Sequence, residues 1–296
     1  MKKCAVALIT LLSLAGAAQA QTVKDLLAAL LVKWNTPTEP FKMIGNVYYV
    51  GTDGLASYLI TSSQGHVLID TGLPEANPQI KANIEKLGFK VADIKYLLNT
   101  HAHIDHTGGL AEMKQASGGQ LVAGEADKPL LEGGYYPGAQ EEIVLNFPPV
   151  KVDRTVREGD TVTLGDVTVT ARETPGHSPG CTSWEFSVKD GDAMRSVLIF
   201  CSGTVALNRL VTNPTYPGIV TDYRTTFARA KDMKPDVLLA PHPEMYKMAE
   251  KRAKLAEGGP NPFVNPGEFN AYAASLEKAF EEALAKQTAA AQEKKG

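Results

Sequence analysis

The chain has 296 residues, 44% of them hydrophobic, so it is long enough for one large core or two small domains. Its formal net charge is −3, and this mild acidity argues against a nucleic acid as partner. No Ser/Gly linker, internal repeat or charge block divides the sequence. One domain that acts on a small molecule is therefore expected.

The first 20 residues have the pattern of a secretory signal peptide. Lys2 and Lys3 precede an uncharged, mostly apolar run from Ala5 to Leu14, and small residues end the segment at Ala20. The apolar run is too short to span a bilayer. We expect cleavage after Ala20, which gives a periplasmic or secreted protein that begins at Gln21 and has no membrane anchor.

The segment that follows predicts an amphipathic helix. Apolar residues recur at helical spacing as far as Trp34, ahead of Pro37 and Pro40. We place this helix within residues 21–36 of a single domain that extends from residue 21 to 296. The helix would either pack on the outside of the core or lean over an active site as a lid.

Short strands and one helix are predicted in the next part of the chain. The strands are Asn46–Gly51, Ala56–Thr61, Gly65–Asp70 and the buried Ile94–Leu98, and the helix is Pro78–Leu87. Hairpins that lead into β-α units indicate a mixed sheet.

Two polar residues flank the third of these strands. Asp70, at its end, would either orient a metal-bound histidine or serve as a turn residue, and the sequence favours neither. His66, at its start, is interpreted as a solvated surface histidine.

The most informative pattern follows the buried strand. The chain has six histidines, and three of them fall between His101 and His106, together with Asp105. His101 and His103 share one side of an extended chain and can hold one ion, whereas Asp105 and His106 fit a turn that would reach a second ion. Imidazole nitrogens with one carboxylate suit zinc better than magnesium or calcium, which prefer oxygen ligands.

Two further histidines lie where strands are predicted to end. His177 follows the strand Asp166–Arg172, in a loop whose prolines and glycines restrict the backbone. His242 follows the buried strand Asp236–Ala240. They supply a third ligand for each of two ions, which gives these sets: His101, His103 and His177 for the first zinc; Asp105, His106 and His242 for the second.

Two cysteines remain after the signal peptide. Cys181 follows the loop of His177, and Cys201 follows the apolar strand Ser196–Phe200. A lone pair of cysteines in an oxidising compartment favours a disulfide. Metal binding by Cys201 is the competing interpretation.

The remaining elements are mostly helical. Helices are predicted at Leu110–Gln115, Thr221–Met233, Glu244–Ala256 and Glu268–Lys286, with a turn-rich break at Gly258–Gly267 and a frayed tail from Thr288. The glycine-rich aromatic segment Gly133–Gly138 is expected to be a surface connection rather than a cofactor site.

These residues together resemble the metallo-β-lactamase superfamily from about Phe41 to the C-terminal helices. The resemblance implies an α/β fold, an αββα sandwich of two mixed β-sheets with helices on the outer faces and the metals at one edge. The superfamily also contains glyoxalase II, lactonases and RNA-processing nucleases, so the fold alone does not identify the substrate.

Three features resemble subclass B3 of this family. Glyoxalase II and the lactonases carry a bridging aspartate after the strand that here runs from Val197 to Phe200, whereas this chain has Cys201-Ser202-Gly203-Thr204. His101 and His106 are both present, as in B3, which frees Cys201 from metal binding and implies a disulfide with Cys181. The secretory signal is the third feature.

The resemblance implies zinc-dependent hydrolysis of the β-lactam amide bond, and hence antibiotic resistance, by a hydroxide shared between two zinc ions. Asp105 would hold the second zinc and could relay a proton. Several B3 enzymes use serines after the same strand to hold the substrate carboxylate, and Ser202 and Thr204 are the substitutes here. A monomer is favoured.

The alternative function is that of a secreted dizinc lactonase or another ester hydrolase of the same superfamily. The missing bridging aspartate argues against it. A non-catalytic zinc module would need a closed coordination shell, whereas three protein ligands per ion leave positions open for water and substrate.

Overall fold

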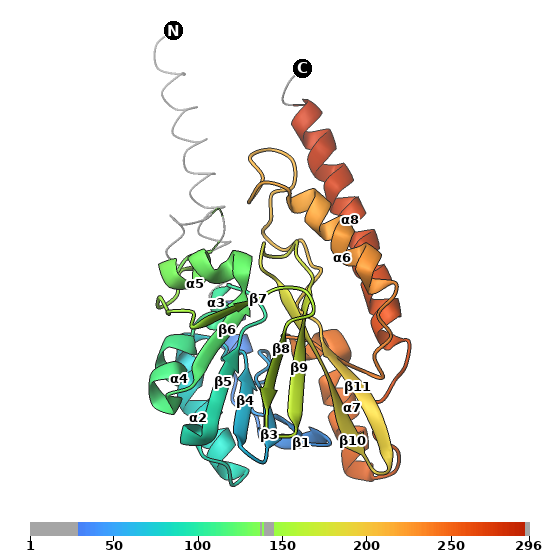
Figure 1. Cartoon of the computed structure of the whole chain (residues 1–296). Coiled ribbons are helices and arrows are strands. Elements are labelled where there is room, and N and C mark those ends of the chain that lie inside the picture. Colours follow the sequence, from blue (N-terminus) through green and yellow to red (C-terminus); the bar gives the residue numbers. More distant parts are fainter. Residues whose placement is uncertain (1–28, 137, 139–144, 294–296) are drawn as a thin grey trace, which may run out of the picture.

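The computed structural model describes residues 29–136, 138 and 145–293. In this part of the chain two mixed β-sheets lie face to face with helices on their outer surfaces, which confirms the predicted αββα sandwich (Figure 1). No helix among the described residues is long and apolar enough to cross a membrane. The predicted signal peptide, residues 1–20, lies outside the described residues. Of the predicted N-terminal helix, residues 29–36 are described, and residues 29–34 are helical.

The first sheet contains β1 to β7 in sequential order. The strands pair antiparallel from β1 to β4 and parallel from β4 to β7. They are Phe41–Ile44 (β1), Val47–Tyr49 (β2), Tyr58–Ser62 (β3), Gly65–Ile69 (β4), Ile94–Leu98 (β5), Gln120–Gly124 (β6) and Arg154–Val156 (β7).

The second sheet has the order β12-β11-β10-β9-β8. Its strands pair antiparallel except for β11 and β12, which are parallel. They are Thr161–Leu164 (β8), Val167–Glu173 (β9), Thr182–Asp190 (β10), Ala193–Ile199 (β11) and Val237–Leu239 (β12).

The helices form two outer layers. The first sheet is covered by Asn77–Lys86 (α2), Leu110–Ser117 (α4) and Lys128–Gly133 (α5), whose apolar residues share a core with its outer face. The other long helices are Ile219–Ala230 (α6), Met248–Glu257 (α7) and Glu268–Glu293 (α8), and the short α3 spans Ile104–Thr107. Side chains of α6 and α8, including Phe227 and Phe280, join the core of the second sheet.

Side chains along the central strands point alternately to the two faces of the first sheet, and this produces two cores. In β4, Leu68 joins the outer core under the helices, while Val67 and Ile69 join the core between the sheets. In β5, Leu97 joins the outer core and Leu98 joins the core between the sheets. Parallel strands buried on both faces read as continuous apolar runs, and this made β5 recognisable.

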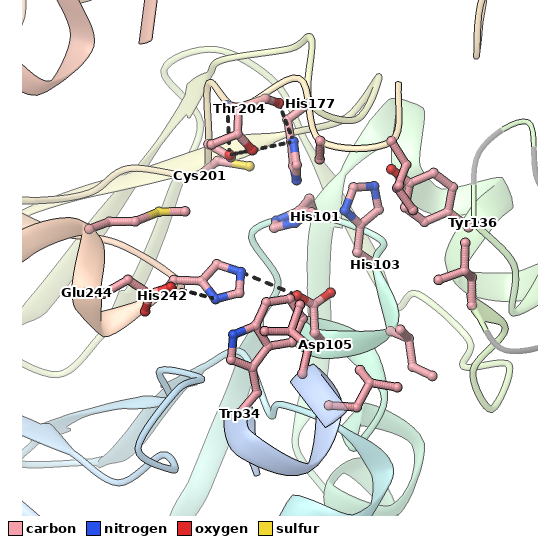
Figure 2. Close-up of a pocket in the computed structure, with 18 residues that line it drawn as sticks. Trp34, His101, His103, Asp105, Tyr136, His177, Cys201, Thr204, His242 and Glu244 are labelled. Carbon is pink, nitrogen blue, oxygen red and sulfur yellow. Dashed lines mark hydrogen bonds and ion pairs between the residues drawn. The ribbon is translucent and has the colours of Figure 1, made fainter. Parts of the chain in front are cut away.

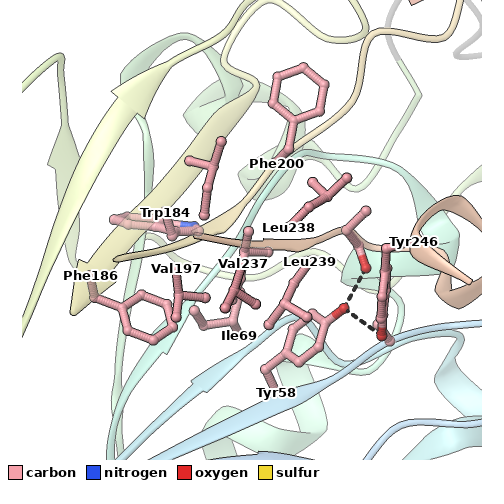
Figure 3. Close-up of a cluster of buried hydrophobic side chains, with 14 of the residues drawn as sticks. Tyr58, Ile69, Trp184, Phe186, Val197, Phe200, Val237, Leu238, Leu239 and Tyr246 are labelled. Carbon is pink, nitrogen blue, oxygen red and sulfur yellow. Dashed lines mark hydrogen bonds between the residues drawn. The ribbon is translucent and has the colours of Figure 1, made fainter. Parts of the chain in front are cut away.

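Polar contacts join the two sheets near the ends of their strands. The hydroxyl of Tyr58 on β3 donates to the carbonyl of Ala240, 2.6 Å away, and lies 3.0 Å from the hydroxyl of Tyr246 (Figure 3). The indole nitrogen of the fully buried Trp184 on β10 donates to the carbonyl of Asn99, 3.2 Å away. These bonds satisfy buried polar groups and fix one edge of the sandwich.

Three expectations need correction. His66 is buried rather than solvated, because β4 lies inside the sheet and the ring of Phe89 packs edge-on against it at 5.0 Å. Helix α7 begins at Met248 rather than at 244, because a 3₁₀ turn ends at Lys247 with a positive φ of 56°. The tail does not fray at Thr288, since α8 continues to Glu293.

Candidate metal centre

The candidate site is built on the carboxyl ends of strands from both sheets. Asp70 follows β4, His101 and His103 follow β5, and Asp127 lies just after β6. From the second sheet, His177 follows β9 and His242 follows β12. In α/β folds, ligands commonly bind outside the carboxyl ends of strands, and here strand ends from two sheets meet.

The structure brings together the first set of predicted ligands. The rings of His101, His103 and His177 lie 4.6–4.7 Å apart, and one nitrogen from each falls within 4.8 Å of the others (Figure 2). All three are buried. The extended backbone of His103, with ψ of 147°, ends where α3 begins.

The second predicted set also converges. Asp105 and His106 lie in α3, and their neighbour across the site is His242. One carboxylate oxygen of Asp105 is 3.2 Å from Nε2 of His106 and 3.3 Å from Nε2 of His242. The rings of His101 and His106 are 4.4 Å apart, so the two sets are adjacent.

Burial and neighbouring groups keep four of these residues in the forms that bind metals, namely His101, His103, His177 and Asp105. Burial lowers the pKa of His101 and His103 well below the usual value and that of His177 to about 4, so all three are neutral at pH 7. Burial opposes ionisation of Asp105, but His106 and His242 outweigh it and hold the pKa of its carboxyl well below the usual range. Neutral imidazoles and an ionised carboxylate are metal ligands.

The residues present fit a metal ion. Nε2 of His101 and Nε2 of His103 are buried and have no hydrogen-bond partner among the described residues. Buried polar atoms are normally paired, so such orphan nitrogens indicate a missing partner. A cluster of imidazoles with one carboxylate has the donor chemistry of a zinc site.

Contacts behind the histidines direct their Nε2 atoms into the site. Nδ1 of His177 donates to the carbonyl of Thr204, 2.7 Å away, and Nδ1 of His242 donates to the carbonyl of Gly54, 3.3 Å away. Nδ1 of His101 lies 3.0 Å from the hydroxyl of Thr100. In each case the other ring nitrogen is left free for a metal.

Asp70 combines the two roles that the sequence left open. It adopts a positive φ of 57°, as a turn residue does, and its carboxylate accepts hydrogen bonds from the backbone and hydroxyl of Thr100 at 2.8 and 2.6 Å. Because that hydroxyl contacts His101, Asp70 orients His101 through Thr100. Its carboxylate is 3.9 Å from Nδ1 of His106.

Asp127 was missed by the sequence analysis. Its buried carboxylate accepts hydrogen bonds from the backbone N–H of Ala102 at 2.9 Å, the hydroxyl of Ser178 at 2.7 Å and the backbone N–H of Gly180 at 2.7 Å. It therefore joins the loop of His101 and His103 to the loop of His177. Burial raises its pKa to about 6. The only sequence signal was an acid just after an apolar strand.

Tyr136 was also missed. The segment that contains it was interpreted as a surface connection, but Tyr136 is buried and stacks on His103 with ring centroids 4.1 Å apart and planes 20° apart. Its hydroxyl has no hydrogen-bond partner in the described part of the chain. Two tyrosines among glycines were the available signal.

A cavity of about 460 Å³ opens onto both ligand sets. Its walls are largely apolar and include Leu30, Leu31 and Trp34, so the described end of the N-terminal helix borders the site. The ring of Trp34 is 4.9 Å from that of His242 (Figure 2). Such a cavity suits a small molecule with an apolar body.

The predicted substrate residues also line this cavity. The hydroxyls of Ser202 and Thr204 lie 3.2 Å apart, and that of Thr204 is 3.2 Å from Nδ1 of His177. The structure therefore places both hydroxyls at the site, where Thr204 also orients a histidine. Cys181 and Cys201 form a disulfide beside them.

Comparisons with known proteins agree with this site. The chain is similar to BJP-1, a subclass B3 metallo-beta-lactamase of Bradyrhizobium japonicum, with 67% identity and a TM-score of 0.86 over 87% of this chain and 98% of that one. Hydroxyacylglutathione hydrolase of Rhodospirillum rubrum is 33% identical over 47% of this chain and 42% of its own length. N-acyl homoserine lactonase AttM of Agrobacterium fabrum is 26% identical over 43% of this chain and 57% of its own length.

The match to each of these two curated relatives spans about half of the relative's length. The model of the metallo-beta-lactamase superfamily matches residues 50–242, which include every predicted ligand. The chain therefore belongs to the metallo-beta-lactamase superfamily of hydrolases, and its fold is that of subclass B3.

Proposed function

We propose that the protein hydrolyses the amide bond of β-lactams with two zinc ions. His101, His103 and His177 would hold the first ion, and Asp105, His106 and His242 the second. The observation that carries the proposal is the pair of adjacent three-ligand groups, with orphan imidazole nitrogens, at the floor of a cavity. Three protein ligands per ion leave positions for water and substrate, as catalytic zinc sites require.

The chemistry follows from the surroundings of these groups. Bound zinc would lower the pKa of a water molecule toward about 7 and polarise a carbonyl. The chain's own contribution is to keep His101, His103 and His177 neutral, to direct Nε2 atoms inward and to keep Asp105 ionised. Because one Asp105 oxygen already contacts His106 and His242, its first role is that of a ligand, with proton relay as an additional role.

The loop after β11 supports a lactam rather than a lactone substrate. It reads Cys201-Ser202-Gly203-Thr204 and offers no carboxylate between the two ligand sets, where lactonases and glyoxalase II have a bridging aspartate. Ser202 and Thr204 both line the cavity, and their hydroxyls would contact a substrate carboxylate. The structural similarity to a subclass B3 metallo-beta-lactamase points the same way.

Hydrolysis of a lactone or another ester is the second candidate. The curated matches to a hydroxyacylglutathione hydrolase and an acyl-homoserine lactonase favour it. An assay of the same preparation with a β-lactam and with an acyl-homoserine lactone separates the two candidates.

The proposal also includes export of the protein from the cytoplasm. The N-terminal sequence pattern and the Cys181–Cys201 disulfide both suit an oxidising compartment, so the mature protein would act in the periplasm or outside the cell, as a monomer.

Substitution of single ligands tests the proposal. His101→Ala and His177→Ala should each lose most lactam hydrolysis and bind the first zinc more weakly, since each removes one of its three ligands. Turnover and zinc content are measured together, and His66→Ala serves as the control because His66 lies outside both groups. A ligand variant that keeps two zinc ions and nearly full turnover would refute the assignment.

A further inference from the structure

The disulfide lies directly against the first ligand set. The two sulfur atoms and one ring nitrogen of His101 all fall within 4.8 Å of one another. Cys201 lines the cavity, on the same side as His177 and Thr204 (Figure 2). Its sulfur is 3.2 Å from the carbonyl oxygen of Thr100. His101 therefore belongs to two possible ligand groups.

The backbone keeps the two cysteines together whether or not they are bonded. Cys181 immediately precedes β10 and Cys201 follows β11, and these strands pair up to Trp184 and Ile199. The N–H of Cys201 also donates to the hydroxyl of Ser183 at 2.9 Å. After reduction, the strand pairing would still present both sulfurs to His101.

Two thiolates and one imidazole form a ligand set that zinc sites use, with a fourth position left open. Thiolates also favour soft cations more strongly than imidazole does. We propose that the reduced pair, Cys181 and Cys201, forms a zinc or cadmium site with His101 and withdraws His101 from His103 and His177. Formation of the disulfide then commits His101 to the catalytic centre, a consequence that rests on the proposed function.

Reduction needs a thiol donor. A dithiol such as dithiothreitol breaks the sulfur–sulfur bond, transfers two electrons and two protons to the cysteines and becomes a cyclic disulfide itself. Binding of the divalent cation then displaces the two thiol protons. Both cysteines are buried, and Cys201 is the one that borders the cavity.

Cadmium alone is the probe for this site, because its bond to thiolate gives an ultraviolet charge-transfer band that imidazole ligands do not give. The metal-free chain is titrated in its oxidised form, after reduction and anaerobic removal of the dithiol, and as the Cys181→Ser/Cys201→Ser variant. The reduced chain should show the band and saturate it with one cadmium, whereas the oxidised chain and the double variant should not.

Two variants complete the test. His101→Ala in the reduced chain should weaken the cadmium affinity measured by this band at least tenfold. Cys181→Ser leaves the thiolate of Cys201 beside His101 without any reductant and should show about half the band. The proposal is overturned if the charge-transfer band is absent from the reduced chain or from Cys181→Ser. It is also overturned if His101→Ala leaves the cadmium affinity unchanged. Lactam hydrolysis by the oxidised chain is a separate readout, so failure of the proposed function is recognised independently.

Discussion

At the scale of single residues, the site depends on groups that touch no substrate. Asp127 has three hydrogen bonds of 2.7–2.9 Å to two loops that carry ligands, and Gly180 approaches it so closely that a Cβ there would lie 2.3 Å from its backbone nitrogen. The spacing between His177 and the pair His101 and His103 is therefore set by one buried carboxylate.

Asp127→Asn should weaken zinc binding at the first ligand set by about 10- to 100-fold, because an amide NH₂ would face donors that need an acceptor. Zinc affinity is measured by competition with a chelating indicator. Ser178→Ala, which removes one of the three hydrogen bonds, should have a smaller effect. Unchanged zinc affinity in Asp127→Asn would show that the hydrogen bonds of Asp127 do not position the ligands.

His66 gives a pH prediction. Burial lowers its pKa from the ordinary value of 6.5, so the folded chain binds fewer protons than the unfolded chain once the pH falls to that value. The stability that His66 contributes is present above this pH and is lost on acidification. His66→Gln should lose less unfolding free energy than the parent between about pH 7.5 and about pH 5.5 in urea denaturation. An equal loss in both proteins would contradict the assignment.

The sequence identified the residues of the two converging sets better than the residues that contact them from behind. Closely spaced histidines and prolines around His177 are informative because few structural roles require them. Asp127 and Tyr136 act through contacts with residues far away in the sequence, at positions 178 and 103, and no local pattern reports such contacts. His66 was misjudged because burial at the start of a strand depends on what packs over it.

At the scale of elements, the N-terminal helix is the segment whose role the structure changes most. Its described end is tied to the loop before β3 by hydrogen bonds from Thr52 and Gly54 to the carbonyl of Trp34, at 2.6 and 3.2 Å. Trp34 also contacts His242, so the described end of the helix forms a wall of the cavity.

Deletion of residues 21–34 should therefore change KM for a bulky lactam, because it removes Leu30, Leu31 and Trp34 from the cavity wall. Steady-state kinetics of the deletion variant and of the mature chain are compared, with circular dichroism to verify the fold. Identical kinetic constants in a folded variant would rule out a role for the helix at the site.

The end of α8 shows why boundaries were harder to predict than elements. Its place near the chain terminus suggested fraying from Thr288. The side chain of Gln287, however, accepts from the backbone of Leu210 at 2.7 Å and donates to the carbonyl of Asn208 at 3.1 Å. Asn208 in turn donates to the carbonyl of His177 at 3.0 Å. Tertiary contacts at Gln287 and the helix-forming residues that follow it together extend the helix.

At the scale of the whole molecule, the site exists because two sheets present their strand ends at one edge. Strands β5 and β12 were predictable from apolar runs next to histidines. Strands β1, β6, β7, β8 and β10 and helix α5 were not identified, because none of them contains a long continuous apolar run. The resemblance to a family supplied the sandwich arrangement, which pattern reading alone reached only as a mixed sheet.

The central claim is that this edge binds two zinc ions and opens a lactam ring. The most direct measurement follows the absorbance of a carbapenem incubated with the purified mature protein, with and without a chelator, while mass spectrometry counts the zinc. We predict loss of lactam absorbance that the chelator abolishes, together with nearly two zinc ions per chain. Two zinc ions without lactam hydrolysis would contradict the proposed substrate and favour a lactone or another ester.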